Sequence, residues 1–415
     1  MPALREQSLD AFASCTAPDA ASSPRKVQFV VKTSKFCNLR CRYCYEYPEL
    51  GNRDTMRRED LQHMYRALAL HFGGHRAGDG PVEIEFVWHG GEPLLVEPDF
   101  YWRSFDDQTR IFEGPGITIS NTVQTNLSVL DEARLKLLHE GFDGVGVSVD
   151  LFSKLRVNQA GRDLQPTVLR HMDRLRAADI AFSCIAVLSR ANRPHLARMF
   201  RFFAESQVSV RFLPVFSGAD AAQNTELALS EAETLAAYVE LFELWLASDA
   251  PIVVEPLSGH VEGVISALTD ARAGNTAARI YDKRAWEPIY LVNTDGNVYS
   301  YADAYDPKKA HGNLFTQPMA ALVEGERHLA VIADAERRMA VCGSCRHYGA
   351  ACDGYPMAEE SPGRADGGSC IRERGILDHI KQRLLELRIV DTASGQLDPR
   401  SPYHRRFRHL QRARP

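Results

Sequence analysis

The sequence predicts an α/β protein made of six strand–helix units, followed by a smaller unit rich in cysteine. Between about residues 27 and 250, short apolar runs alternate with amphipathic helical patterns, as is typical of parallel β/α units. Seven of the nine cysteines fall in two clusters, one after the first apolar run and one near the C-terminus. A chain of 415 residues is long enough for one large core and a small additional unit.

The strands and helices can be placed by their periodicity. Strands are expected at residues 27–32, 82–88, 117–123, 144–149, 180–188 and 208–215. Helices are expected at 58–72, 99–112, 131–139, 166–177, 193–205 and 230–246. Barrels of parallel β/α units carry their chemistry on the loops after the C-terminal ends of the strands. Functional residues are therefore expected on those loops.

Composition excludes several classes of function. The net charge of −5 gives no reason to expect nucleic acid or a membrane surface as partner. No apolar run is long enough to span a bilayer, and residues 1–24 have no apolar signal core, so a cytoplasmic location is expected. An odd number of clustered cysteines indicates metal binding in a reducing compartment rather than a disulfide framework.

The first cysteine cluster follows the first predicted strand. Cys37, Cys41 and Cys44 have the spacing C-x3-C-x2-C. Three thiolates leave one iron of a four-iron cubane cluster open, and a small chelating molecule can bind there. Thiols buried by chance and a zinc knuckle are the alternatives, but structural zinc needs four close ligands and no fourth lies nearby.

This spacing, with Tyr43 before the third cysteine, resembles the radical S-adenosylmethionine (SAM) enzymes. The resemblance implies a partial (β/α)6 barrel and a [4Fe-4S] cluster whose open iron holds SAM. It also implies reductive cleavage of SAM to a 5′-deoxyadenosyl radical, which abstracts a hydrogen from the substrate. After the second strand, Gly90-Gly91-Glu92-Pro93 is similar to the family's GGEP motif, whose backbone and glutamate hold the SAM amino group. Glycines there would let the backbone approach a ligand closely, although a tight turn before a helix-starting proline is the alternative.

Further candidates for SAM contacts follow the third and fourth strands. Gln124 and Asn126 belong to a segment that resembles the family's QTN segment. Ser148 and Asp150 match a Ser-x-Asp strand end that the resemblance places at the SAM ribose and carboxylate.

An arginine follows that strand end in the family, and a guanidinium fork suits a carboxylate. The spacing here is shorter than in many members, so Arg156 and Arg162 are both candidates. Arg156 is preferred, with a solvated surface charge as the alternative. Leu188, at the end of the fifth strand, would lie under the adenine in the family, but apolar packing explains it equally well.

The C-terminal part begins with a predicted hairpin. Residues 289–299 contain two β-type runs around Asp295-Gly296, a strong hairpin signal. The segment through residue 314 resembles the first half of a SPASM domain, the C-terminal extension of many peptide-modifying radical SAM enzymes. That domain normally has a cysteine just after the hairpin, but residues 300–303 contain none. Asp303 lies beside this position, where related enzymes carry a catalytic acid.

The second cysteine cluster contains Cys342, Cys345, Cys352 and Cys370. Four thiolates are enough for one closed cluster, and the resemblance maps them onto the second SPASM auxiliary cluster. The cysteine expected about four residues after Cys352 is absent. The sequence therefore predicts one auxiliary [4Fe-4S] cluster, with a structural zinc site as the alternative.

The expected organisation is a flexible arm (1–25), the radical SAM barrel (26–250), a connector (251–285), the SPASM-like domain (286–388) and a basic tail (389–415). The resemblance implies a maturase that oxidatively modifies a side chain of a ribosomal precursor peptide, forming a cross-link such as a cyclophane. Alternatives are a sulfatase-maturing, formylglycine-forming enzyme, a radical SAM enzyme for a small metabolite, and an iron–sulfur sensor. The expected partners are the precursor peptide, a reductant such as flavodoxin or ferredoxin, and a separate leader-binding protein.

Overall fold

The computed structural model describes residues 25–73, 80–114, 116–215, 224–273, 280–300, 307–354, 370–391, 394, 396–401, 403 and 407. Six parallel strands lie side by side in chain order and confirm the predicted strand positions and fold class. They are β1 (Arg25–Ser34), β2 (Val82–Gly90), β3 (Ile117–Thr125), β4 (Gly144–Ser148), β5 (Ser183–Leu188) and β6 (Val210–Pro214).

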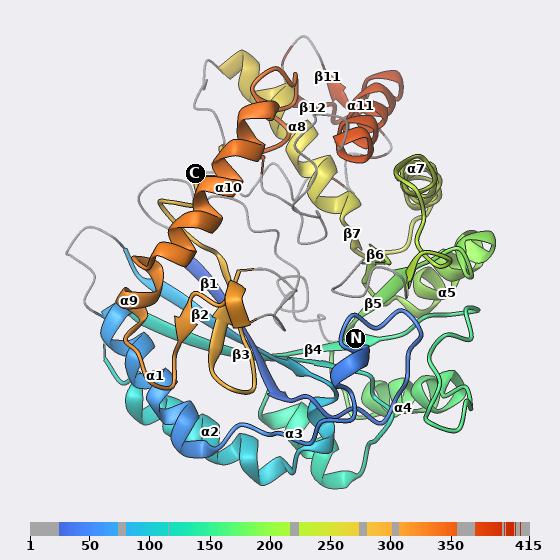
Figure 1. Ribbon diagram of the computed structural model, residues 1–415. Helices are drawn as coiled ribbons and strands as arrows, with labels where there is room; N and C mark the ends of the chain where they lie inside the picture. The colour runs from blue at the N-terminus through green and yellow to red at the C-terminus, as the bar shows by residue number, and fades with distance from the viewer. Residues whose placement is uncertain are drawn as a thin grey trace.

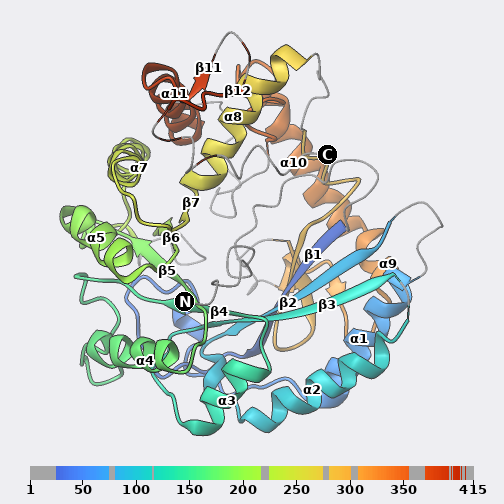
Figure 2. The same ribbon diagram turned by 180° about the vertical axis from the view of Figure 1, so that it is seen from behind.

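The predicted helices follow these strands and cover the outer side of the curved sheet (Figures 1 and 2). They are α1 (Arg58–Gly73), α2 (Pro98–Ile111), α3 (Glu132–Glu140), α4 (Gln165–Ala177), α5 (Leu196–Ser206) and α7 (Glu231–Leu246). Local sequence signals fix several helix starts. Ser230 and Glu233, for example, form a reciprocal capping box at the start of α7.

The two faces of the sheet differ because strand side chains alternate. Phe29, Phe86 and Trp88 point outward into the main hydrophobic core beneath the helices. Their neighbours Lys32 and His89 lie on the opposite, inner face, side by side in the β1–β2 register. The inner face at the C-terminal ends of the strands is therefore polar, whereas the core lies outside the sheet.

The expected connector is an ordered part of the fold. It contains β7 (Val254–Glu255), which pairs with β6, and the helix α8 (Leu257–Ala273). Glycines weaken the helical pattern in this part of the sequence. A Cβ at Gly263 would lie 2.5 Å from the carbonyl oxygen of Ala351, so packing against the C-terminal part requires the glycine.

The C-terminal hairpin extends the barrel sheet. β8 (Ile289–Val292) pairs with β9 (Asn297–Tyr299) as predicted, and Gly296 occupies the turn with φ +85°. β10 (Gly312–Asn313) then pairs with β9. The sequence did not predict that β8 also pairs in parallel with β1, opposite Phe29 at Tyr290. The result is one ten-stranded sheet in the order β10-β9-β8-β1-β2-β3-β4-β5-β6-β7.

The remaining helices are α9 (Met319–Val323), α10 (Glu326–Cys342) and α11 (Ile371–Glu386), and α11 packs on α7 and α8. Within the tail, β11 (Val390–Asp391) pairs with β12 (Gln396–Leu397). Phe407 is buried, with its ring 6.1 Å from that of Trp245. These parts of the basic tail pack against the protein. No helix among the described residues is both long and apolar enough to cross a membrane.

Candidate functional site

The first three cysteines lie on the loop that follows β1. The backbone N–H of Cys37 donates to the carbonyl of Leu50 at 3.1 Å. On the other side, Arg40 N–H donates to Val157 O at 2.7 Å and Arg42 N–H to Leu155 O at 3.2 Å. These bonds fasten the thiol loop, residues 37–44, to the segment that carries Arg156.

Cys37 and Cys41 are buried and Cys44 is half-buried, and the three thiols lie within electrostatic reach of one another. Burial raises the pKa of Cys37 to about 12, and the nearby Glu92 and Cys41 add to the rise. Burial also raises the pKa of Cys44, with further contributions from Glu46, Cys41 and Cys37. Metal ligation requires thiolates, so cluster binding must displace these protons.

The three thiols remain the expected ligands of the cluster. Among the described residues, no three His, Cys, Asp or Glu side chains converge as ligands of one metal ion. The thiolates of a cubane bind different irons. That Cys37, Cys41 and Cys44 would hold a [4Fe-4S] cluster on this loop stays a prediction from their spacing.

Gly90, the last residue of β2, and Gly91 are required by contact with residues 34–36, which lead into the thiol loop. A Cβ on Gly90 would lie 2.2 Å from the carbonyl oxygen of Ser34, and one on Gly91 would lie 2.3 Å from that of Phe36. The backbones are hydrogen-bonded here, Gly91 N–H to Ser34 O at 2.8 Å and Glu92 N–H to Phe36 O at 3.0 Å. In this structure the glycines thus permit close approach of the backbone of residues 34–36. From the sequence, close approach of a ligand was expected.

Glu92 joins the loops after β2 and β3. Its buried carboxylate accepts hydrogen bonds from Thr125 Oγ1 at 2.6 Å, Asn126 N–H at 2.6 Å and Leu94 N–H at 2.9 Å. Burial raises the pKa of Glu92, and these hydrogen bonds oppose the rise. Pro93 is buried at the start of a short 3-10 turn. The role of Glu92 toward the SAM amino group stays a prediction.

Side chains after β3 and β4 continue this network. Asn126 Nδ2 lies 3.6 Å from Cys37 Sγ and 3.2 Å from Asn38 Oδ1. Gln124 Nε2 donates to Ser148 Oγ at 2.8 Å. Asn38 in turn donates to Ser128 Oγ at 2.8 Å. Asn38 and Ser128 were missed in the sequence because a lone polar loop residue carries no distinctive pattern.

A small pocket beside the thiol loop brings together the candidates from β4. Leu39, Ser148, Asp150 and Arg156 line it. Arg156 Nη1 lies 3.0 Å from Tyr43 Oη and 3.4 Å from Asp150 Oδ2. Arg156 Nε is buried without a hydrogen-bond partner. A buried guanidinium with an unsatisfied N–H suits a carboxylate ligand.

The other two candidates here are placed differently. Arg162 is exposed, and its backbone N–H donates to Asn158 Oδ1 at 2.9 Å. Of the two arginines, Arg156 is the one that lines the pocket. Leu188 is fully buried in the main hydrophobic core, a position that packing alone explains. Burial raises the pKa of Asp150, while the Arg156 charge opposes that rise.

A group of buried charges at the inner rim was missed. Lys32 Nζ lies 2.7 Å from Glu46 Oε1, and both side chains are at most 2% exposed. Burial lowers the pKa of His89, and Lys32 lowers it further while Glu46 opposes the change. Sequence alone could not pair these residues because they come from β1, the segment just after the thiol loop, and β2.

The second thiol cluster begins at Cys342, the last residue of α10. Cys345 N–H donates to Cys342 O at 2.8 Å, and Cys352 N–H donates to His347 O at 2.9 Å. Cys370 stands immediately before α11. Asp378 of α11 holds the loop between these cysteines, through an ion pair with Arg346 and a 2.7 Å contact with His347 Nε2. Asp303 lies outside the described residues.

The fold and the site together define a class. A curved sheet of parallel β/α units, with a three-thiol loop after its first strand, is the arrangement of an iron–sulfur protein with a barrel-type site. Residues 31–203 match the sequence model of the family described as Radical SAM superfamily. The chain therefore carries a radical SAM domain, and the cofactors of that domain are a [4Fe-4S] cluster and SAM.

Curated relatives include sulfatase-maturating enzymes. A serine-type anaerobic sulfatase-maturating enzyme of Klebsiella aerogenes is 33% identical over 190 residues, which is 44% of this chain and 44% of the relative. The match thus spans less than half the length of that relative. A cysteine-type enzyme of Clostridium perfringens (strain 13 / Type A) is 23% identical over 76% of this chain and 84% of its own.

Solved structures share the fold. Native anSMEcpe with bound AdoMet and the Cp18Cys peptide has a TM-score of 0.64 at 19% identity, covering 87% of this chain and 98% of that one. Streptococcus suis SuiB bound to S-adenosylmethionine has a TM-score of 0.54 at 13% identity, covering 81% of this chain and 75% of that one. The likeness extends beyond the radical SAM domain into the C-terminal part.

Proposed function

We propose that this protein is a radical SAM enzyme that oxidises a side chain of a ribosomally made peptide and forms a cross-link such as a cyclophane. The observation that carries the proposal is the extent of the similarity in fold to a protein that was solved with a bound peptide. That similarity covers 87% of this chain. A cluster and SAM alone would be compatible with many substrates. The shared C-terminal part favours a peptide.

The residues of the radical SAM domain have separate roles in this proposal. Cys37, Cys41 and Cys44 hold the catalytic cluster. When bound, the cluster and SAM supply one-electron chemistry that removes a hydrogen atom from the substrate. Arg156, with its unsatisfied Nε–H, binds the SAM carboxylate, and Asp150 fixes the guanidinium. The other proposed contacts with SAM are Tyr43, Gly90, Gly91, Glu92, Pro93, Gln124, Asn126, Ser148 and Leu188.

The oxidation must also dispose of an electron and a proton. Joining two C–H carbons releases two hydrogen atoms, one of which is taken in the first abstraction. The second leaves as a proton and an electron. Cys342, Cys345, Cys352 and Cys370 would hold an auxiliary [4Fe-4S] cluster, and a closed cluster is suited to electron transfer. The proposed proton acceptor is Asp303.

Formylglycine formation is the second candidate function. Sulfatase-maturating enzymes among the curated relatives favour it. Two cysteine positions of the SPASM pattern are vacant in this sequence, after the hairpin and after Cys352. Those losses set the chain apart from an enzyme that uses two auxiliary clusters and favour the cross-linking function.

Mass spectrometry of peptide products distinguishes these functions. The anaerobically reconstituted protein is given SAM, dithionite and one of two peptides. One peptide carries a sulfatase-type Cys or Ser, and the other is encoded by a short reading frame beside the gene. Loss of two hydrogens without an aldehyde, and with linked fragments, supports the cross-link. A product trapped by a hydrazide reagent supports formylglycine. If SAM is cleaved to 5′-deoxyadenosine and neither peptide changes, the peptide proposal is wrong.

The partners of this reaction are proposals of the same kind. A flavodoxin or ferredoxin would supply the electron, and a separate protein would present the leader of the precursor peptide. Replacing dithionite with a purified flavodoxin and its reductase tests the first. Adding the candidate leader-binding protein and measuring the apparent affinity for the peptide tests the second.

A further inference from the structure

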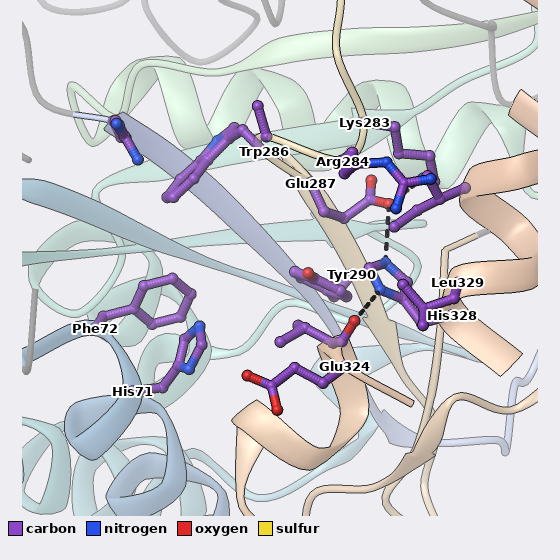
Figure 3. Close-up of a pocket in the computed structure, with 14 residues that line it drawn as sticks. His71, Phe72, Lys283, Arg284, Trp286, Glu287, Tyr290, Glu324, His328 and Leu329 are labelled. Atoms are coloured by element: carbon purple, nitrogen blue, oxygen red, sulfur yellow. Dashed lines mark hydrogen bonds and ion pairs between the residues drawn. The ribbon is translucent and has the colours of Figure 1, made fainter. Parts of the chain in front are cut away.

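A cavity lies at the seam where β8 joins β1, on the outer face of the sheet. Its volume is about 280 Å³. Figure 3 shows His71 and Phe72 projecting from α1 on one side, and His328 and Leu329 from α10 on the other, with Tyr290 of β8 between them. We call this cavity the seam pocket. It is separate from the thiol loop, which follows the opposite end of β1.

Aromatic rings form the walls of the seam pocket. Tyr290 stacks on Phe29 at a centroid distance of 5.4 Å, and Phe72 meets Trp286 edge to face at 6.2 Å. Such surfaces are suited to a large apolar group. The volume lies just below the range of pockets for drug-sized molecules, about 300 Å³ and above, so it fits a single large side chain.

One buried polar atom of the seam pocket has no hydrogen-bond partner among the described residues. His328 is 3% exposed, and its Nδ1 donates to Val323 O at 2.9 Å. Its Nε2 faces Glu287 Oε2 at 3.7 Å without a hydrogen bond. Leaving a buried polar atom unsatisfied is unfavourable, so a ligand that pairs with His328 Nε2 would gain stability.

Among the described residues, the cations of the seam pocket differ in their pairing. Lys283 pairs with Glu287, and Arg284 pairs with Glu336 at 2.9 Å. The Arg25 guanidinium lies 5.4 Å from the Trp286 ring centroid and has no carboxylate partner among the described residues. A guanidinium over an aromatic ring still offers its N–H groups to a carboxylate. An acidic group on the ligand would therefore complement this end of the pocket.

Two exposed leucines belong to or adjoin the lining of the seam pocket, which also includes charged residues such as Glu324. Leu329 lines the pocket and is 41% exposed, and Leu70, 76% exposed, directly precedes the lining residues His71 and Phe72. Exposed apolar side chains next to a pocket can add contact area for a bound chain.

We propose that the seam pocket anchors a recognition segment of the peptide substrate, through one large apolar side chain next to an acidic residue that pairs with Arg25. The inference rests on the proposed peptide substrate. It assigns the pocket to a segment other than the modified residue, because the pocket is on the outer face, whereas the thiol loop lies at the far end of β1.

This placement predicts a spacing in the substrate. Arg25 is the first of the ten residues of β1, and the thiol loop follows the last. A strand rises about 3.3 Å per residue, so the two sites are about 30 Å apart along the strand. An extended substrate needs on the order of ten residues between its anchor and its modified residue to reach both.

Synthetic peptides can test the anchor directly on the reconstituted holoenzyme. The probe is a fluorescein-labelled decapeptide of Gly and Ser with a central Phe-Glu pair, and its controls carry Ala-Glu and Phe-Lys. By fluorescence anisotropy we expect the Phe-Glu peptide to bind about tenfold more tightly than either control, as one charged hydrogen bond or one buried ring provides. Equal affinities for the three peptides would overturn the proposal.

Charge reversal supplies the second arm of the test. Arg25→Glu is expected to weaken binding of the Phe-Glu peptide about tenfold and to tighten binding of the Phe-Lys peptide. Leu329→Asp, at the exposed mouth, should weaken both. If the Arg25→Glu variant binds both peptides as tightly as the wild type does, the proposal that the seam pocket anchors the peptide is wrong. SAM cleavage without peptide should be unaffected in both variants, so loss of the anchor is distinguishable from failure of the proposed reaction.

Discussion

The backbone N–H of Arg40 donates to the carbonyl oxygen of Val157 at 2.7 Å. This bond joins the middle of the thiol loop to the residue that follows Arg156. Residues that would bind the cluster and residues that would bind SAM are therefore parts of one backbone unit. A substitution that displaces the backbone of the thiol loop is therefore expected to displace the segment that carries Arg156, and the reverse.

Arg156 and Arg162 form a matched pair for testing the SAM site. Arg156→Met should weaken SAM binding by about ten- to one-hundredfold, because it removes a charged donor from the pocket. Arg162→Met should change it less than about twofold, because Arg162 is exposed. Equilibrium binding of SAM to the reconstituted protein checks both. Arg156→Lys, which keeps the charge but lacks the fork, should give an intermediate affinity. A larger effect at Arg162 would refute the assignment.

Gly91 and Gly51 test the contact behind the GGEP motif. A methyl group at Gly91 would meet three backbone atoms within 2.4 Å, and backbone cannot yield cheaply. Gly91→Ala should therefore destabilise the protein by about 1–3 kcal/mol and lower its iron content. Gly51→Ala is the control, because nothing lies within 4 Å of its added methyl group. Thermal unfolding and iron analysis provide the measurements, and equal behaviour of the two variants would contradict the packing argument.

Iron content counts the clusters. The wild type should hold about eight irons and the Cys37/Cys41/Cys44→Ala variant about four, one cubane each for the two thiol sets. Cys184→Ala serves as control, since Cys184 is buried in β5 within the main core. About four irons in the wild type, none in the triple variant and bound zinc would make the second site structural. About twelve irons would mean that the number of lost SPASM ligands has been overestimated.

Asp378 is expected to stabilise the second thiol loop. Asp378→Asn weakens its contacts with Arg346 and His347, so the variant should lose about 1 kcal/mol of stability and release auxiliary iron faster to a chelator. Iron at the first thiol loop should remain. Asp60→Asn is a suitable control, because Asp60 binds Arg57 in the same two-pronged way on α1. Identical iron release in the two variants would show that Asp378 does not stabilise the second thiol loop.

The sequence predicted the fold where local pattern and global structure agree. Six strands and six helices were found because buried strands and amphipathic helices have clear periods. The helix α8 was missed because Gly259 and Gly263 interrupt its pattern, while the reason for Gly263, its contact with Ala351, is a tertiary one. The parallel pairing of β8 with β1 was missed for a similar reason, since no local pattern specifies a partner more than 250 residues away.

The sequence predicted those residues of the candidate site that belong to recognisable motifs. The thiol loop, Glu92 and Arg156 come from motifs and lie together in the structure. Contacts between loops could not be predicted from the sequence. Examples are the contacts of Glu92 with Thr125 and of Lys32 with Glu46. They depend on which strand ends become neighbours, and the chain order alone does not give side-chain directions at the rim.

The pairing of β1 with β8 also bears on how the protein is made. During synthesis, β1 leaves the ribosome with one edge unpaired until residue 292 has been added. At ribosomal rates of about 5–20 residues per second, that edge stays open for on the order of ten seconds or more. An open edge strand is a template for aggregation. The nascent chain therefore passes through a period in which chaperones would be needed most, and truncation before residue 289 would make that period permanent.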